Sequence, residues 1–372
     1  MEYLFILGRN VELSKKEVFS YLERKEISIK KYSIKENGLL IETDKEIKEN
    51  AIDELGGVLF IGKVSIKGKL EKELEKIEVY SGIKNNITYA LWNFSSEKKH
   101  EKFLDSLKKR FKKEKLRASE KTLSGKIKLQ EGEFASKVGS KLIDKKYFLF
   151  EDENEENYFG EIIQECDYEK IEKRDMNKPV RREELAISPR IAKIMINLSG
   201  VKKGPLVDAF CGIGTILYES LLQEIPIIGV DKDGKAIVGA KKNLAWGRFE
   251  QKKYQLITND SRKVRISKAE VLVSEPDFGK TLKRVPTDEM IKKQMMDFEE
   301  VIIRVINNLK NSIYGKIVFS APLILTKKKG RRKGCEIEKI LNETGLKVLE
   351  GFPVKEYREG QIVGREIFVL EK

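Results

Sequence analysis

Three acidic residues close three successive apolar runs in the second half of the chain. Asp208 ends the run in PLVDAF, Asp231 the run in PIIGVDKD and Asp260 the run in YQLITND. After the first acid, Gly212 and Gly214 form a turn without side chains, where a ligand can press against the backbone. Carboxyl ends of parallel strands share one ligand-binding edge of a sheet, and a carboxylate after the second strand can accept hydrogen bonds from both ribose hydroxyls. The pattern predicts a ribose-containing ligand at this edge.

The glycine turn differs from the fingerprint that binds dinucleotides. That fingerprint needs a third glycine at the helix start, and the corresponding position is Leu217. The sequence therefore does not imply a loop shaped for a pyrophosphate.

A fourth apolar run ends in an acid, a proline, a second acid and an aromatic residue. It reads VLVSEPDFGK over residues 271 to 280. As the fourth strand end of the same sheet, the segment EPDF borders the crevice that the first three strand ends line. A donor at the first three strands and a substrate at the fourth form a geometry suited to group transfer.

These segments lie in a regular alternation of strand-like and helix-like runs. A helix starting at Ser188-Pro189 precedes the first strand, and a long helix is expected over about 288 to 310. A further helix is expected near 335 to 344, with strands around 346 to 351 and 363 to 370. Strict alternation predicts a doubly wound, mostly parallel seven-stranded sheet in a Rossmann-like domain over 188 to 372.

The first half of the chain follows a different order. Strands expected at 3–7, 27–34, 38–42 and 58–64, with helices near 14–22 and 44–55, give the βαββαβ order of a ferredoxin-like domain over residues 1 to 68. Beyond it we expect a strand over 87–94, an amphipathic helix over 101–116, a helix over 134–142 and a hairpin of 145–152 with 157–164. Residues 166 to 187 show little periodicity and are predicted to be a linker.

Composition narrows the classes of function. The chain has 372 residues and a formal net charge of +14, which favours polyanionic partners. Three widely spaced cysteines and one histidine, His100, argue against a zinc site, a disulfide framework and a Ser-His-Asp hydrolase. We predict no metal, no membrane span and a cytoplasmic protein, and expect a monomer.

Two segments concentrate positive charge. Residues 97 to 117 hold ten Lys or Arg against four acids, and TKKKGRRKG, residues 326 to 334, holds six cations and no acid. Either could be an ordinary solvated surface. Because the second segment follows a strand end on the side of the crevice, it could also hold phosphates. The candidate RNA-binding residues are Lys108, Lys109, Arg110, Lys112, Lys113, Lys327, Lys328, Lys329, Arg331, Arg332 and Lys333.

The segment DAFCGIGT resembles the Asp-Pro-Phe-Cys-Gly-Ser-Gly-Thr loop of class I S-adenosylmethionine-dependent methyltransferases that act on amino groups of nucleic acids. ISPRIAKIMINLSG followed by VDAFCGIGT is similar to the corresponding segment of THUMP-containing tRNA guanine-N2 methyltransferases. Tyr168, Arg174 and Asp175 resemble that family's linker. The resemblance covers essentially the whole chain and implies a THUMP-like RNA-binding domain over residues 69 to 165, with S-adenosylmethionine as cofactor and tRNA as partner.

The resemblance also implies the roles of individual residues. It places the loop around the methionine part of the cofactor, Asp231 on the ribose and Asp260 near the adenine amino group. The implied cofactor-binding residues are Asp208, Phe210, Cys211, Gly212, Gly214, Thr215, Asp231, Lys232, Asp260 and Ser261. The family's amine-holding motif, Asp or Asn followed by Pro, Pro and an aromatic, falls on the implied catalytic residues Glu275, Pro276, Asp277 and Phe278.

Two positions of this motif depart from the family pattern. Glu275 places its carboxylate one methylene further out, and Asp277 replaces a proline and adds a second negative charge. Asp277 could point to solvent or pair with Lys280, which would leave Glu275 to accept the hydrogen bond of the amine. Alternatively, the site no longer catalyses and the chain only binds RNA. A methyltransferase acting on rRNA or on adenine N6 of DNA is a further alternative to methylation of a tRNA guanosine.

Overall fold

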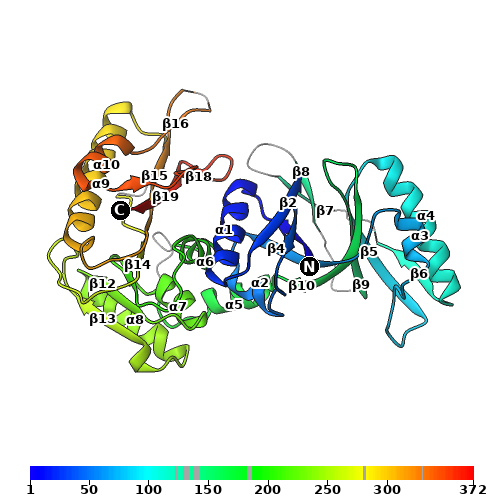
Figure 1. Cartoon of the computed structure of the whole chain (residues 1–372). Coiled ribbons are helices and arrows are strands. Elements are labelled where there is room, and N and C mark those ends of the chain that lie inside the picture. The colour runs from blue at the N-terminus through cyan, green and yellow to red at the C-terminus, as the bar shows by residue number, and fades with distance from the viewer. Residues whose placement is uncertain (122–124, 129–133, 138–142, 182–186, 280–281, 329) are drawn as a thin grey trace. The chain divides into compact units, whose positions relative to one another are not determined.

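A computed structural model describes residues 1–121, 125–128, 134–137, 143–181, 187–279, 282–328 and 330–372 (Figure 1). The contacts within the chain divide it into two compact units. The first unit comprises residues 1–11, 27–53 and 57–166, and the second comprises residues 12–26, 54–56 and 167–372. None of the described helices is both long enough and apolar enough to cross a membrane.

The first unit is built on one eight-stranded sheet. Its strand order is β2-β3-β1-β4-β10-β9-β5-β6. The strands are β1 (Glu2–Leu7), β2 (Ile29–Lys35), β3 (Gly38–Thr43), β4 (Val58–Lys67), β5 (Asn86–Phe94), β6 (Arg117–Glu120), β9 (Lys145–Glu151) and β10 (Asn157–Glu165). The βαββαβ order and the β9-β10 hairpin are confirmed. Because β4 pairs with β10, the ferredoxin-like and THUMP-like ranges share this sheet. Their division into separate domains stays a prediction.

The helices of this unit are shorter than expected at one place and absent at another. They are α2 (Ala51–Glu54), α3 (Leu70–Leu74) and α4 (Glu97–Lys113). The helix expected over 44–55 is wrong except for α2, because the Asp44 carboxylate instead accepts a hydrogen bond from the Ser28 amide. The helix expected over 134–142 is also wrong for residues 134–137. Residues Phe134–Lys137 form β8, whose backbone pairs antiparallel with β7 (Gly125–Lys128), and residues 138–142 lie outside the described residues.

The second unit contains the expected doubly wound sheet. Its main path is β13-β12-β11-β14-β15-β19-β17, with β16 paired to β15 and β18 to β19. The first five strands of this path are parallel, whereas β19 runs antiparallel to its neighbours. The strands are β11 (Leu206–Asp208), β12 (Ile227–Asp231), β13 (Tyr254–Thr258), β14 (Val271–Ser274), β15 (Ile317–Leu325), β16 (Arg332–Lys333), β17 (Lys347–Val348), β18 (Val354–Glu356) and β19 (Val363–Glu371).

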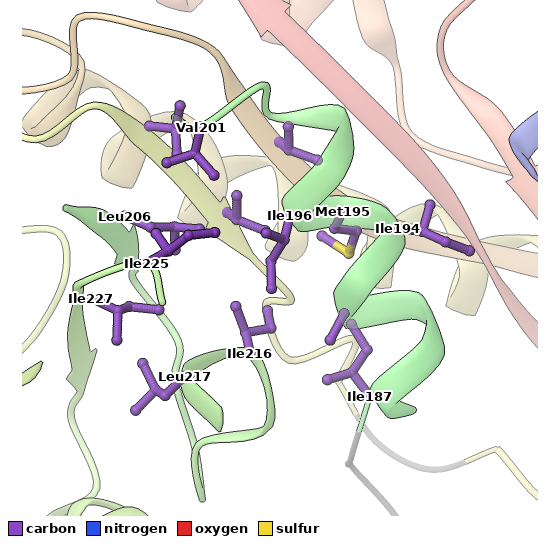
Figure 2. Packing of buried hydrophobic residues seen from close by; sticks show 14 of the residues in the cluster. Ile187, Ile194, Met195, Ile196, Val201, Leu206, Ile216, Leu217, Ile225 and Ile227 are labelled. Atoms are coloured by element: carbon purple, nitrogen blue, oxygen red, sulfur yellow. The ribbon is translucent and has the colours of Figure 1, made fainter. Parts of the chain in front are cut away.

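Helices cover both faces of this sheet. The neighbours Leu206 and Val207 of β11 belong to two different apolar clusters, since successive strand residues point to opposite faces. Figure 2 shows Ile196 of α6 in the same apolar cluster as Ile216 and Leu217 of α7. The helices are α1 (Val11–Arg24), α5 (Tyr168–Met176), α6 (Pro189–Leu198), α7 (Thr215–Leu222), α8 (Gly234–Trp246), α9 (Asp288–Leu309) and α10 (Ile337–Thr344), with a 3-10 turn at Gln251–Lys253.

The predicted linker contains α5. No residue of this helix is buried, so its sequence carries no apolar stripe that periodicity could detect. The helix is fixed instead by the Asp167 side chain, which accepts from the Lys170 amide, and by Arg174, which forms a two-point ion pair with the buried Glu219 of α7.

A buried polar network joins α1 to α6 inside the second unit. Asn197 of α6 accepts a hydrogen bond from Arg24 (3.0 Å) and donates to the Glu17 carboxylate (2.9 Å) and the Glu54 carbonyl (2.8 Å). Arg24 also pairs with the Glu54 carboxylate at 2.7 Å. Because every partner is buried or nearly so, these groups are satisfied by one another rather than by water.

Candidate active site at the carboxyl edge of the second sheet

The loop between β11 and α7 depends on two glycines in left-handed backbone conformations. Gly212 has φ of 52° and Gly214 has φ of 90°. A Cβ at Gly214 would lie 3.3 Å from Ala240 Cβ, so this turn is packed against α8. A Cβ at Gly212 would meet no atom within 4 Å, so its backbone faces open space that a ligand can occupy. Thr215 is the first residue of α7, whose free amides point toward the same loop.

Asp231 holds this loop from the end of β12. One carboxylate oxygen accepts from the Gly212 amide at 2.8 Å, and the other accepts from the Asp233 amide at 2.9 Å. A carboxylate has about four acceptor sites, so both oxygens can accept further hydrogen bonds. Lys232, the next residue, is exposed.

Asp208 and Ser274 join the ends of β11 and β14. The Ser274 hydroxyl donates to Asp208 Oδ1 at 2.6 Å. The Phe210 amide donates to Asp208 Oδ1 and to Ser274 Oγ, each at 3.1 Å. Asp208 is 1% exposed. Burial raises the pKa of its carboxyl to about 7, and the negative charges of Asp231 and Glu275 act in the same direction.

Asp260 and Ser261 follow β13. The Asp260 carboxylate accepts from the Arg262 amide and guanidinium at 2.6 to 3.0 Å, and these bonds lower its pKa to about 2. The buried Ser261 hydroxyl donates to the Ala209 carbonyl at 2.5 Å. Ser261 therefore ties the third strand end to the glycine loop, and Asp260 lies at the expected strand end with its charge already paired.

Other residues of the loop are part of the core. Cys211 is buried, and burial raises the pKa of its thiol. Phe210 is partly buried against the cluster under α9. Asn243 of α8 donates to the carbonyls of Ile213 (2.9 Å) and Val180 (3.0 Å) and accepts from the Val180 amide (2.9 Å). This asparagine anchors the loop to the segment before α6.

The Glu275 carboxylate is fixed by donors from two neighbouring strands. Its Oε1 atom accepts from the Ser320 hydroxyl of β15 at 3.1 Å and from Arg365 Nε of β19 at 2.9 Å. The Glu275 side chain is 11% exposed. The predicted acid thus lies at the end of β14, next to Ser274, with its charge balanced by Arg365.

The rest of the motif forms a tight turn. Pro276 is buried, and the exposed Asp277 accepts a hydrogen bond from the Gly279 amide at 2.9 Å. Asp277 therefore points toward solvent, as one of the two alternatives expected, while Lys280 lies outside the described residues. Phe278 packs edge-on against Phe298 of α9, with ring centroids 6.2 Å apart.

The positively charged residues of α4 lie in the first unit. Lys108, Lys109, Lys112 and Lys113 are exposed, as expected for a solvated or RNA-binding face. Arg110 differs, because its guanidinium donates to the Ile77 carbonyl at 2.7 and 3.0 Å and so fixes the loop after α3.

The second basic segment is a hairpin rather than an irregular loop. β16 pairs with the end of β15, and the Thr326 amide donates to the Arg331 carbonyl at 2.9 Å. Arg332 is half-buried, stacks 4.2 Å from the Tyr357 ring centroid and donates to the carbonyls of residues 323, 361 and 362. Lys329 lies outside the described residues. The exposed cations of the hairpin are Lys327, Lys328, Arg331 and Lys333.

Three side chains of the site were missed by sequence reasoning. Ser274, Ser320 and Arg365 donate to the two acids at the ends of β11 and β14. Ser274 could have been found, since a serine ends an otherwise apolar run directly before the motif. The contacts of the other two depend on the order of the strands, which the local sequence does not contain.

Residues 178–307 match the family described as RMKL-like, methyltransferase domain. The match covers 130 of the 372 residues and lies within the second unit. The tRNA (guanine(10)-N2)-dimethyltransferase of Methanothermobacter thermautotrophicus is 35% identical over 96 residues, which cover 25% of this chain and 28% of the relative. The enzyme of the same name from Pyrococcus abyssi is 27% identical over 161 residues, covering 42% of this chain and 44% of that relative. The matched regions thus span less than half the length of these relatives.

Among solved structures, TrmN from Thermus thermophilus aligns over 100% of both chains with a TM-score of 0.52 and 14% identity. At this identity the likeness concerns the fold alone. This likeness and the methyltransferase domain match together confirm the predicted fold class. It is a Rossmann-like class I methyltransferase domain that follows an α+β N-terminal part in the sequence.

The Gly212 backbone predicts a test of the cofactor site. Gly212→Ala should weaken binding of S-adenosylhomocysteine by about tenfold or more, because the new methyl group enters the open space beside the loop. Gly345→Ala is the matched control, since Gly345 has a similar φ of 66° and open surroundings at the end of α10. Each variant should lose about 1–2 kcal/mol of stability. Calorimetric titration showing equal affinity in both would contradict the assignment.

The raised pKa of Asp208 predicts a pH-dependent stability. The folded protein binds this proton more tightly than the unfolded chain, so ionisation disfavours folding. The free energy of unfolding should fall by about 4 kcal/mol as pH rises from about 4 to 7. Asp208→Asn should remove this decline in urea denaturation, whereas Asp297→Asn at an exposed position of α9 should keep it. A parallel decline in Asp208→Asn would show that another group causes it.

Proposed function

We propose that this chain transfers a methyl group from S-adenosylmethionine to the exocyclic N2 amine of a guanosine in tRNA. The observation that carries the proposal is the position of Glu275. Its carboxylate is held at the end of β14, directly after Ser274, which bonds to the acid that opens the glycine loop. The names of the two archaeal relatives support the choice of amine and of RNA.

The residues at the first two strand ends fit this cofactor. Asp231 would accept the ribose hydroxyls, and the open backbone at Gly212 would lie against the methionine part. When bound, S-adenosylmethionine supplies an electrophilic methyl group on a positively charged sulfur. The Asp231 carboxylate, whose described partners are backbone amides, gives this edge of the sheet a negative charge that complements it.

Glu275 would act on the substrate amine. Its carboxylate accepts a hydrogen bond from the N2 amine, which increases the availability of the nitrogen lone pair for attack. Transfer of the methyl group from the sulfur, with S-adenosylhomocysteine as the leaving product, would give the nitrogen a positive charge. It becomes neutral again by losing one proton to the carboxylate that already accepts its hydrogen bond. Phe278, on the same turn, is the candidate for stacking against the base.

The RNA-binding part of the proposal rests on the first unit and the β15–β16 hairpin. The exposed lysines of α4 and the exposed cations of the hairpin can contact phosphates. Lys108 and Lys113 would first exchange their ion pairs with Glu120 and Glu75 for the phosphate. Arg110 and Arg332 are less suited, because their guanidinium groups are engaged by backbone carbonyls. With tRNA as substrate, we expect the protein to work in the cytoplasm and as a monomer.

Methyl transfer can be measured directly. Wild type should transfer tritiated methyl groups to unmodified tRNA, and Glu275→Ala should reduce kcat by about 100-fold or more. Glu289→Ala, at an exposed position in the first turn of α9, is the matched control and should retain full activity. Nucleoside mass spectrometry should find N2-methylguanosine. Background counts in wild type would leave a non-catalytic RNA-binding protein, and product in rRNA or at adenine N6 of DNA would refute the proposed substrate.

The hairpin cations can be tested by salt dependence. The double variant Arg331→Ala/Lys333→Ala should bind tRNA more weakly and reduce the slope of log K against log salt by about 2, with unchanged cofactor affinity. The double variant Lys241→Ala/Lys242→Ala removes two exposed cations from α8 and should match wild type. Identical slopes for both variants would exclude the hairpin from the RNA contact.

A further inference from the structure

The hydrogen bonds of Glu275 are one-sided. Both donors, Ser320 Oγ and Arg365 Nε, bind the same oxygen, Oε1. None of the described residues donates a hydrogen bond to Oε2. The second oxygen therefore keeps its acceptor sites, while the first is anchored to the sheet.

The anchor matters because Glu275 has one more rotatable bond than an aspartate. A free glutamate side chain holds up to about 2 kcal/mol of rotamer entropy, which would spread the carboxylate over several positions. Ser320 and Arg365 lie within β15 and β19, whose pairing places Arg365 opposite Pro322. Two donors from adjacent strands thus remove a freedom that the longer side chain introduced.

Arg365 also contacts the aromatic residue of the motif. Its guanidinium carbon lies 5.8 Å from the ring centroid of Phe278. The Phe278 ring also packs against Phe298, and the Gln294 side chain donates a hydrogen bond to the Phe278 carbonyl. One arginine therefore touches both the acid and the aromatic side chain of the turn, and relates their positions to each other.

We propose that Arg365 is a positioning residue, whose Nε–H bond to Glu275 Oε1 directs Oε2 toward the substrate amine. This inference rests on the proposed function of Glu275. In this arrangement β19 supplies a constraint from outside the motif turn, in which Asp277 does not fix the backbone angle as a proline would.

Two substitutions separate the bond from the charge. In Arg365→Gln, the amide nitrogen stands as many bonds from Cα as the arginine Nε, so the donor is retained and the charge is lost. Arg365→Met removes both. We expect Arg365→Met to lower kcat by about 10- to 100-fold, with tRNA KM and S-adenosylhomocysteine affinity within about twofold of wild type. Arg365→Gln should stay within about threefold of wild type in kcat.

A double variant adds a second criterion. Arg365→Met should have no further effect in the Glu275→Ala background, because a positioning residue acts through the group that it positions. A full additional loss in Glu275→Ala/Arg365→Met would overturn the proposal, as would equal losses in Arg365→Gln and Arg365→Met. Melting curves and S-adenosylhomocysteine binding identify any variant that fails to fold.

The contact has a readout that does not depend on activity. In ¹⁵N-labelled protein the Arg365 Nε–H proton should exchange slowly with water in wild type and rapidly in Glu275→Ala. Slow exchange in both would overturn the contact itself. If this proton behaves as expected but wild type transfers no methyl groups, the proposed function fails and the positioning role fails with it, whereas the bond stands as a structural contact.

Discussion

The hydrogen bond between Ser274 and Asp208 is the constraint on which the geometry of the candidate site depends. It spans the ends of β11 and β14 beyond the last paired residues of the two strands, Val207 and Leu272. The glycine loop starts at Asp208 and the motif turn starts after Ser274, so one bond sets the distance between the two. Because the bond is buried, water does not compete for it and it is stronger than the same bond at the surface.

Four acids at neighbouring strand ends would repel one another unless each were neutralised or solvated. The negative charge of each acid is compensated in a different way. Asp208 holds its proton more tightly because it is buried. Asp231 accepts hydrogen bonds from two backbone amides. Asp260 forms an ion pair with Arg262, and Glu275 forms one with Arg365. The local charge therefore differs from strand to strand along this edge of the sheet.

The sequence predicted the parts of the site that lie next to each other along the chain. The strand ends, the two glycines and the motif turn are visible because each acid directly follows an apolar run. Arg365 and Ser320 could not be predicted, because their contact with Glu275 follows from β19 lying antiparallel beside β15. The wrong helix over 134–142 has a similar cause, since pairing with β7 decided the conformation of Phe134–Lys137. Arg332 shows the reverse case, in which a residue of a basic run is half-buried and bonded to carbonyls.

The network around Asn197 bears on how the protein is made. Glu17, Arg24 and Glu54 precede Asn197 by 143 to 180 residues, and the Asn197 side chain forms a hydrogen bond with each of them. At the usual rate of bacterial or eukaryotic synthesis, Asn197 leaves the ribosome roughly 7 to 30 seconds after Glu54. During this interval Glu17 and Arg24 of α1 lack their contact with Asn197, whereas Arg24 can already pair with Glu54. The charged groups keep this surface of α1 hydrated. It loses its water only after α6 has been synthesised and packs against it.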